Sequence, residues 1–205
     1  FWGGGANIMP NERLIFPDNR DWDYLQGNIY AANVITSGGD IENISSLLIP
    51  SIVENYISQS LTSENEIRIF RFNIPVSITI RSITFKIINN HAGRFTSIGI
   101  YNADGTTKLV DSGAISATPA GVKTITLGTP IQLDAGTYIQ AWTSDSASMT
   151  WVAMQLGSSH TTDIMNAGVV QIGKAANTSA VGVLPATLGA LTSAYIFPAL
   201  VKYQA

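Results

Sequence analysis

From residue 66 onward this sequence consists largely of short runs in which apolar and polar residues alternate. In one such run Val76, Ile78 and Ile80 alternate with Ser77 and Thr79. Alternation with a period of two sends successive side chains to opposite faces of a β-strand, and it does not fit a helix. β-Branched residues, which are abundant here, also suit a pleated sheet better than a helix. We therefore expect strands over this part of the chain.

Turn-forming residues separate these runs and indicate where strands end. Asp104-Gly105 lies between two strand-like runs and is a strong signal for a tight hairpin. In the first run the phase of alternation shifts between Ile69 and Phe70, which predicts a β-bulge. Pro198 favours an edge position or a bulge in the last run. Many short strands separated by turns predict an antiparallel sandwich or barrel rather than a parallel sheet. The expected strands are 66–74, 76–80, 83–87, 94–101, 107–112, 122–127, 130–134, 136–144, 148–156, 169–173 and 193–203, and the rest of 157–190 is expected to be a long loop.

Leu133, Gly136 and Tyr138 have the spacing of a tyrosine corner. In this motif a turn is followed by a Tyr whose hydroxyl bonds to upstream backbone, at the place where the chain crosses between sheets. The alternative is a strand start flanked by Gly, with a half-buried Tyr. Strand-like residues continue to Trp142, which favours the corner. We therefore expect an all-β fold: an antiparallel Greek-key or jelly-roll-like β-sandwich with an irregular N-terminal arm.

Charge divides the chain into two parts. Residues 1–66 contain nine acidic and two basic residues, hence a net charge of −7, whereas residues 67–205 contain five acidic and nine basic residues, hence +4. Residues 1–65 also show little periodicity. We assign residues 1–65 to an N-terminal arm or anchor and residues 66–205 to the β-sandwich. Unless the charge step is an accident of the surface, the acidic arm lies against the basic part of the same chain or of a neighbour.

The composition excludes several classes of protein. Without cysteine, the chain forms no disulfide, zinc finger or iron–sulfur cluster. No apolar run reaches the ~18 residues of a membrane span, so we expect no membrane insertion. The formal net charge of −3 opposes binding to nucleic acid duplexes, which depends on many basic residues.

The sequence offers few residues for catalysis. His91 and His160 lie in separate polar stretches, whereas metal sites favour histidines at short spacing. The carboxylates of the body fall at expected turns, where Asp is favoured because its side chain bonds to nearby backbone. Turn formation explains them better than glycoside hydrolysis does. We therefore expect no catalytic residue, no cofactor and no metal. The four carboxylates are Asp104, Asp111, Asp134 and Asp145.

Aromatic residues suggest where a sugar could bind, because rings can stack on the apolar faces of pyranoses. The candidate glycan contacts are Trp151, Tyr101 and the turn residue Asp145. Trp142 shares a strand face with Tyr138, so we expect it in the core. Polar loops on a rigid sandwich are the usual carriers of binding. The loops expected to form a recognition surface are 89–94, 102–107, 144–148 and 157–166.

Three segments resemble a known family: SIGIYNADGTTKLVDSG (97–113), IQLDAGTYIQAWTSD (131–145) and GVLPATLGALTSAYIFPALV (182–201). Together they resemble the β-sandwich, jelly-roll-like domains of tail fibres, receptor-binding proteins and other virion-surface proteins of tailed bacteriophages. The similarity covers about residues 66–203. The hairpin and the corner also occur in carbohydrate-binding modules of secreted enzymes. No catalytic residue is carried over by this resemblance.

The resemblance implies a non-enzymatic structural protein of the virion, located at the particle surface or tail as a fibre, receptor-binding or decoration component. It implies a homo-oligomer, often a trimer, which contacts other virion proteins through residues 1–65 and recognises a glycan on the host surface. Only 12% of residues are charged, against a typical ~25%, which lowers the desolvation cost of large subunit contacts. The alternatives are a carbohydrate-binding module or lectin-like domain of a secreted protein, a glycan hydrolase, and a single-jelly-roll capsid subunit.

Overall fold

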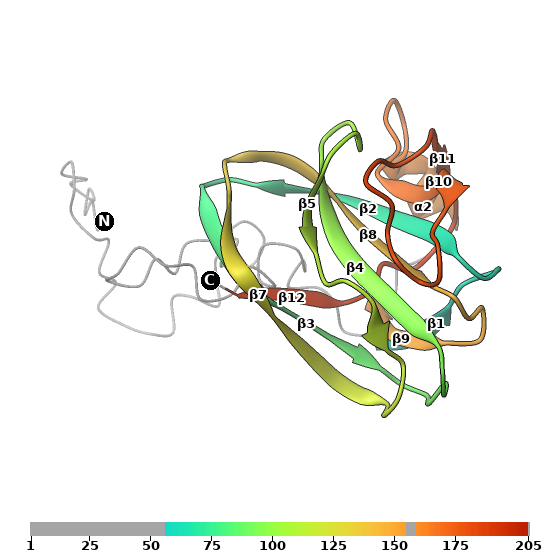
Figure 1. Ribbon diagram of the computed structural model, residues 1–205. Coiled ribbons are helices and arrows are strands. Elements are labelled where there is room, and N and C mark those ends of the chain that lie inside the picture. Colours follow the sequence, from blue (N-terminus) through green and yellow to red (C-terminus); the bar gives the residue numbers. More distant parts are fainter. Residues whose placement is uncertain (1–55, 155–158, 205) are drawn as a thin grey trace, which may run out of the picture. The chain divides into compact units, whose positions relative to one another are not determined.

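The computed structural model describes residues 56–154 and 159–204, which form two antiparallel β-sheets (Figure 1). The predicted all-β sandwich is confirmed, while residues 1–55 of the predicted arm lie outside the described residues. The five-stranded sheet comprises β1 (Tyr56–Ser60), β3 (Ile78–Ile87), β7 (Gly121–Leu133), β9 (Thr150–Met154) and β12 (Val201–Gln204). The seven-stranded sheet comprises β2 (Glu66–Ile74), β4 (Phe95–Asn102), β5 (Lys108–Asp111), β6 (Ile115–Ser116), β8 (Gly136–Ser144), β10 (Ile172–Thr178) and β11 (Leu191–Ser193). A short helix, α2 (Ser159–Met165), lies between β9 and β10 in the sequence.

Successive strands alternate between the two sheets along much of the chain. The chain crosses from β2 in the seven-stranded sheet to β3 in the five-stranded sheet and back to β4, and it alternates again from β7 to β10. The seven-stranded sheet has the order β11-β10-β2-β8-β4-β5, with β6 also paired to β4. In the five-stranded sheet β3 pairs with β7, β12 and β9, and β9 pairs with β1. Each crossing brings another apolar strand face to the space between the sheets.

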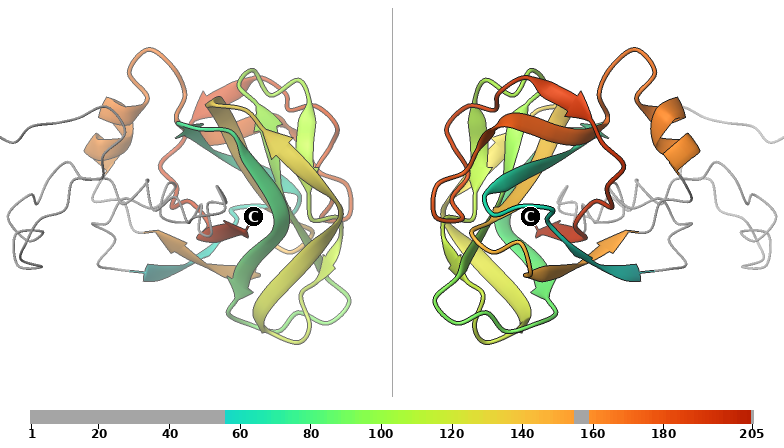
Figure 2. Two further views of the ribbon diagram at one scale, coloured as in Figure 1. Left: turned by 90° about the vertical axis from the view of Figure 1, so that its left-hand side faces the viewer. Right: turned by 90° about the vertical axis from the view of Figure 1, so that its right-hand side faces the viewer.

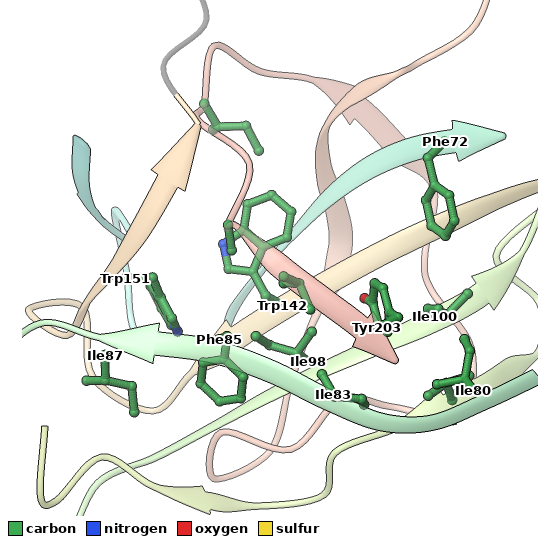
Figure 3. Packing of buried hydrophobic residues seen from close by; sticks show 14 of the residues in the cluster. Phe72, Ile80, Ile83, Phe85, Ile87, Ile98, Ile100, Trp142, Trp151 and Tyr203 are labelled. Atoms are coloured by element: carbon green, nitrogen blue, oxygen red, sulfur yellow. The ribbon is translucent and has the colours of Figure 1, made fainter. Parts of the chain in front are cut away.

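The main core fills this space (Figure 3). β3 contributes Ile80, Ile83 and Phe85, β8 contributes Trp142, and β9 contributes Trp151. All five side chains are buried, and Trp142 is in the core as predicted. Burial of one large apolar side chain stabilises the fold by about 1.5–3 kcal/mol. The alternation in β3 thus indicated correctly which of its residues face the interior.

A second, smaller core lies on the outer face of the seven-stranded sheet. Ile67 and Ile69 of β2 and Ile139 of β8 are fully buried there, and Leu184 and Leu188 belong to the same cluster. The two leucines come from residues 179–191, which we call the cover segment. Because of this layer, the seven-stranded sheet is buried on both faces, as strands with continuous apolar runs often are.

The second core explains the phase shift in β2. We predicted a bulge between Ile69 and Phe70, but the register of β2 with β8 is continuous from Arg68 to Ile74. Ile67 and Ile69 face the second core, and Phe72 and Ile74 face the main core. The predicted bulge is therefore wrong: the shift marks the change from one buried face to the other.

The cover segment is fixed at both of its ends. At its start, the side-chain oxygen of Asn65 accepts hydrogen bonds from the Ser179 hydroxyl and the Gly182 amide, both at 3.1 Å. Toward its end, the Leu188 amide donates to the Gly105 carbonyl at 2.8 Å. Asn65 and Gly105 lie on loops at opposite ends of the strands, so the segment runs over the outer face from one end of the strands to the other (Figure 2).

One tyrosine joins the cover segment to the sheet beneath it. The fully buried Tyr101 of β4 donates a hydrogen bond of 2.5 Å to the Pro185 carbonyl. Burial, together with the charge of Asp111, raises the pKa of this phenol, so it remains a donor. Nearby, Gly99 of β4 leaves room for Leu184, because a Cβ at residue 99 would lie 3.2 Å from the leucine Cδ1 and only 2.5 Å from a backbone oxygen of β5.

The two predicted turns have the expected geometry. Gly105 has a φ of 77°, in the left-handed region, and β4 and β5 pair as an antiparallel hairpin around it. At the predicted corner, the Tyr138 hydroxyl donates a hydrogen bond of 2.8 Å to the Asp134 carbonyl, and Leu133 is buried. The chain crosses here from β7 in one sheet to β8 in the other, as a tyrosine corner requires.

Several boundaries differ from those predicted. Runs 76–80 and 83–87 merge into one strand, β3, which begins only at Ile78. Runs 122–127 and 130–134 merge into its partner β7, which ends at Leu133, and the register between these strands shifts once. The expected last strand 193–203 is split into β11 and β12, because Pro198 lies between them and its carbonyl accepts from the Met154 amide. Residues 56–60, which we assigned to the arm, form β1 and pair with β9. No helix in the described part of the chain is long and apolar enough to cross a membrane.

Candidate recognition surface

Strand direction decides which of the predicted recognition loops come together. Loop 89–94 precedes β4 and loop 102–107 follows it, so they lie at opposite ends of that strand. Loop 144–148 follows β8, which runs antiparallel to β4 with Ser144 opposite Thr96. The structure therefore brings loops 89–94 and 144–148 together at one end of the sandwich. We call these two loops the loop cluster.

Asn89 connects the two loops of the cluster. Its side-chain Nδ2 donates to the Ser148 carbonyl at 3.0 Å, and its Oδ1 accepts from both the amide and the hydroxyl of Thr150, at 2.8 and 2.7 Å. One amide side chain thus holds loop 89–94 against the beginning of β9. These bonds order the polar loops, so their exposed atoms need little further ordering on binding a ligand.

His91 lies between the same two loops. Its Nε2 is 2.8 Å from Asn89 Nδ2, and its Nδ1 is 3.4 Å from the hydroxyl oxygen of Ser146. Ser146 is buried, whereas His91 is half-buried. The ring therefore contributes to loop packing and keeps part of its surface in contact with water.

Arg94 and Asp145 form the third link of the cluster. The Asp145 carboxylate accepts a 2.7 Å hydrogen bond from the Phe95 amide, and Arg94 Nη1 donates to the Asp145 carbonyl at 2.9 Å. Arg94 also lies 3.5 Å from the carboxylate of Glu64, and both of these side chains are about half exposed. An exposed pair of this kind contributes little to stability, so the guanidinium can exchange Glu64 for another acceptor.

The exposed part of the loop cluster is polar and carries a cation. Asn90, Gly93, Arg94 and Ser148 are exposed, and Asn90 also accepts a hydrogen bond from the Ala120 amide of a third loop. This surface presents amide, hydroxyl and guanidinium groups on a fixed backbone. Such groups suit a hydroxyl-rich or anionic ligand better than an apolar one.

The other two predicted loops are not part of this surface. Asp104 in loop 102–107 accepts hydrogen bonds from the amide and the hydroxyl of Thr106, at 2.9 and 2.6 Å, and these bonds lower the pKa of Asp104. That loop contacts the cover segment instead, because the Thr187 hydroxyl donates to the Thr106 carbonyl. The described residues of loop 157–166 form α2, which exposes His160.

The three predicted glycan contacts are buried. Trp151 is 1% exposed in the main core, Tyr101 is 0% exposed beneath the cover segment, and Asp145 is 7% exposed. A ring can stack on a sugar only if one of its faces is accessible, and the Asp145 carboxylate is already bonded to the Phe95 amide. The structure therefore does not support these three residues as glycan contacts, and Arg94 and Asn90 are better placed. The burial of Trp151 was not predicted, because the sequence pattern of its strand does not show which face of the strand points toward the core.

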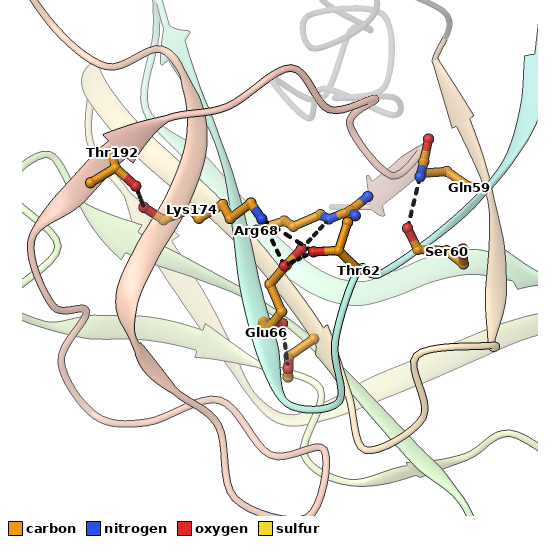
Figure 4. Close-up of polar contacts among 8 residues, drawn as sticks. Gln59, Ser60, Thr62, Glu66, Arg68, Lys174 and Thr192 are labelled. Carbon is orange, nitrogen blue, oxygen red and sulfur yellow. Dashed lines mark hydrogen bonds and ion pairs between the residues drawn. The ribbon is translucent and has the colours of Figure 1, made fainter.

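A buried charge cluster, which the sequence analysis did not identify, joins β2 to β10 (Figure 4). Glu66 and Arg68 lie two residues apart on one strand, and Lys174 lies directly opposite Arg68 in β10. The Glu66 carboxylate is 2.7 Å from Arg68 Nε and 2.8 Å from Lys174 Nζ. The acid-x-base spacing of residues 66–68 was the available sequence signal, because residues two apart share a strand face.

The charge cluster determines the protonation of Glu66. Burial alone would raise the pKa of this carboxyl, but hydrogen bonds from Lys174, Thr62 and Arg68 outweigh that effect and lower the pKa to about 2. Arg68 is 1% exposed, and its Nη1 has no hydrogen-bond partner among the described residues. Glu66 therefore stays ionised between Arg68 of β2 and Lys174 of β10, and it links the two strands rather than acting as an acid or a base.

The other body carboxylates bond to nearby groups at turns. Asp111 accepts hydrogen bonds from the Gly113 amide and from Lys108, and Asp134 accepts one from Ser77. In the described part of the chain no three His, Cys, Asp or Glu side chains are grouped so that they could hold a metal ion.

No protein-family model, no curated protein and no solved structure matches this chain. The resemblance to virion-surface domains therefore rests on the sequence segments that carry it.

Proposed function

We propose that this chain is a non-enzymatic structural protein of a bacteriophage virion, which acts through surface contacts and recognises a glycan on the host through the loop cluster. The single observation that carries the recognition surface is the set of side-chain bonds between loops 89–94 and 144–148. The bonds hold an exposed cation and exposed amides at one end of a sandwich. Loops fixed in this way on a rigid framework are a common basis for recognition.

The resemblance and the composition support the assignment to a particle. The segment 182–201, one of the three that resemble virion-surface domains, supplies most of the cover segment of the second core. Bonding of the body carboxylates at turns fits a scaffold better than a hydrolase, which needs two carboxylates facing one substrate bond. A low share of charged residues favours large contacts between protein surfaces.

The assignment to a particle is tested by fractionation. Phage particles from a culture that produces this chain are purified through a density gradient, and each fraction is probed with an antibody against residues 56–204. We expect the chain in the particle fraction. If it is found only in the soluble fraction, the virion assignment is wrong, and a secreted carbohydrate-binding module becomes the better interpretation.

Recognition is tested separately with a matched pair of arginine variants. The full chain is applied to an array of immobilised bacterial surface polysaccharides, alone and as Arg94→Ala or Arg81→Ala. Both arginines are exposed, but Arg81 lies on β3, outside the loop cluster. We expect Arg94→Ala to weaken binding by at least about tenfold, which corresponds to one lost charged hydrogen bond, and Arg81→Ala to leave it unchanged. Equal loss in both variants, or no binding by the unaltered chain, would remove the loop cluster as the recognition surface.

A further inference from the structure

The strand β7 forms an edge of the five-stranded sheet. It is 13 residues long, and among the described residues it pairs with β3 alone. In Figure 1 it is the yellow strand that lies in front of β3. An edge strand presents a row of unpaired backbone amides and carbonyls, which is a template for pairing with another strand.

Other edge strands of the described residues are shorter or covered. β11 has three residues and β6 has two. β5 has four residues, and the cover segment protects it, because the Lys108 amide donates to the Ala186 carbonyl. Short length and a covering loop are the usual ways in which proteins avoid edge-to-edge pairing. Among the described residues β7 is neither short nor covered. A charge, a proline or a bulge can also protect an edge, but Pro130 and the register shift of β7 lie beyond Thr126, so residues 121–126 carry Lys123 alone.

The first half of β7 is well suited to pairing. Residues 121–126 are in continuous register with β3, and the register shifts between Thr126 and Ile131, a stretch that includes Pro130. Lys123 is the single charged residue of the strand. Val122 is 66% exposed, and Thr124 and Thr126 are exposed on the same face. A Val/Thr-rich edge suits pairing with another strand, provided that the single lysine does not face a second lysine across the contact.

We propose that β7 is the interface between two copies of this chain, which pair β7 to β7 in antiparallel orientation about a two-fold axis at Thr124. Thr124 lies near the middle of residues 121–126, the stretch in continuous register with β3. With this centre, Lys123 lies opposite Ile125 of the second copy, and Val122 lies opposite Thr126. No like charges face each other, which is the condition that a self-complementary interface must meet.

The pairing also covers apolar surface. Ile125 and Leu127 point toward the main core but are only partly buried at the edge of the sheet. A second β7 beside them would extend the sheet and cover their exposed sides. This inference is independent of the proposed function. It requires an even number of copies in this contact, whereas the trimer implied by the family resemblance would need a different surface.

Cysteine crosslinking tests the proposal, and the chain is suited to it because it contains no cysteine. In the proposed register the two Thr124 side chains lie opposite each other, with Cβ atoms about 4.5–5.5 Å apart, close to the range of a disulfide. We expect Thr124→Cys to form a disulfide-linked dimer on mild oxidation. Thr137→Cys, an exposed position on β8 in the other sheet, is the matched control and should stay unlinked.

The register itself is tested by mixing two variants. In the proposed register, residue 122 of one copy lies opposite residue 126 of the other and far from residue 122 of the other. Val122→Cys or Thr126→Cys alone should therefore link poorly, whereas an equimolar mixture of the two variants should link well. If Val122→Cys alone links as efficiently as Thr124→Cys, the register is wrong. If Thr124→Cys stays unlinked and the full chain has the mass of a monomer in solution, β7 is not an interface between copies.

A charge swap distinguishes lost pairing from lost folding. Thr124→Lys and Thr124→Glu each place like charges opposite each other, and each should weaken the dimer by at least about tenfold. An equimolar mixture of the two variants should recover a heterodimer, measured by mass in solution, since opposite charges then face each other. Failure of the mixture to recover the dimer, with both variants folded by circular dichroism, would overturn the proposal.

Discussion

The outer faces of the two sheets differ in what they contact. On the seven-stranded sheet, Ile69 and Ile139 are fully buried beneath the cover segment. On the five-stranded sheet, the corresponding outer positions are polar: Thr84 of β3 bonds to Thr124 of β7 at 3.0 Å, and Lys86 is exposed. The two faces show that a strand of this fold alternates cleanly only where one of its faces is in water. Where both faces are buried, apolar residues occur on both, and the period of two is lost.

The largest effect should come from a carboxylate placed on the covered outer face. Ile139→Asp removes a buried side chain from the second core and leaves an unpaired charge beneath the cover segment. We expect a loss of more than about 5 kcal/mol in the free energy of unfolding, which is enough to unfold a marginally stable domain. Denaturant unfolding, or failure to obtain folded protein, measures this loss.

The matched control is a carboxylate on the open outer face. Lys86 lies on the exposed side of β3, the central strand of the five-stranded sheet, and the control variant is Lys86→Asp. We expect a change within about 0.5 kcal/mol, as for most surface substitutions. If both variants were tolerated equally, the outer face of the seven-stranded sheet would be open to water, and the cover segment would not be a layer of the fold.

The next effect concerns the buried charge cluster, which ties β10 of the covered sheet to β2. Glu66→Gln leaves Arg68 and Lys174 without their carboxylate. Folding lowers the pKa of Glu66 from 4.5 to about 2, a shift that corresponds to about 3 kcal/mol. We expect that loss at neutral pH, measured by denaturant unfolding. Glu64→Gln, in the half-exposed pair with Arg94, is the control and should cost less than about 1 kcal/mol.

The pH dependence of the same variant tests the cause. Because the pKa of Glu66 is lower in the folded chain, its stabilisation is fully present above pH 4.5 and is lost as the pH falls toward about 2. The difference in unfolding free energy between the unaltered chain and Glu66→Gln should therefore shrink over this interval. A difference that stays constant down to about pH 2 would mean that Glu66 acts through packing and not through charge.

The comparison of the two faces also explains how much of the fold the sequence could predict. One face of β3 is exposed to solvent, and the alternation of apolar and polar residues correctly predicted which face is buried. The hairpin at Gly105 and the corner bond of Tyr138 follow from local turn chemistry, so they were predictable too. In β2, by contrast, the phase shift at Ile69 was misread, because a cover segment more than 100 residues away determines which of its positions are buried.

The candidate site was less predictable than the fold. The loops were identified as polar, but only the antiparallel pairing of β4 and β8 decides that 89–94 meets 144–148 and not 102–107. Trp151 was chosen as a glycan contact because its ring can stack on a sugar and no neighbouring residue assigned it to the core, unlike Trp142. Its burial depends on the opposite sheet, which has no signature in the local sequence.

A smaller effect is expected from the bond that fastens the cover segment. Tyr101→Phe removes the hydroxyl that donates to the Pro185 carbonyl and leaves that oxygen without its donor. We expect a loss of about 1–2 kcal/mol, because one hydrogen bond to a buried group disappears while the ring stays in place. Amide hydrogen exchange should become faster in the cover segment, at Leu188 in particular, and remain unchanged in β3. Equal acceleration in both regions would indicate a global loss of stability and not a looser cover.

The smallest effect should come from the corresponding change at the corner between the sheets. Tyr138→Phe removes the hydrogen bond to the Asp134 carbonyl, but Tyr138 is only half-buried, so water can replace the lost donor. We expect a loss of about 0.5–1 kcal/mol by denaturant unfolding, below that of Tyr101→Phe. The two substitutions remove the same atom from the same kind of bond and differ mainly in solvent access. A larger loss of unfolding free energy for Tyr138→Phe than for Tyr101→Phe would contradict this order. The crossing from β7 to β8 would then depend on that single bond, and the corner would stabilise the fold more than the bond to the cover segment does.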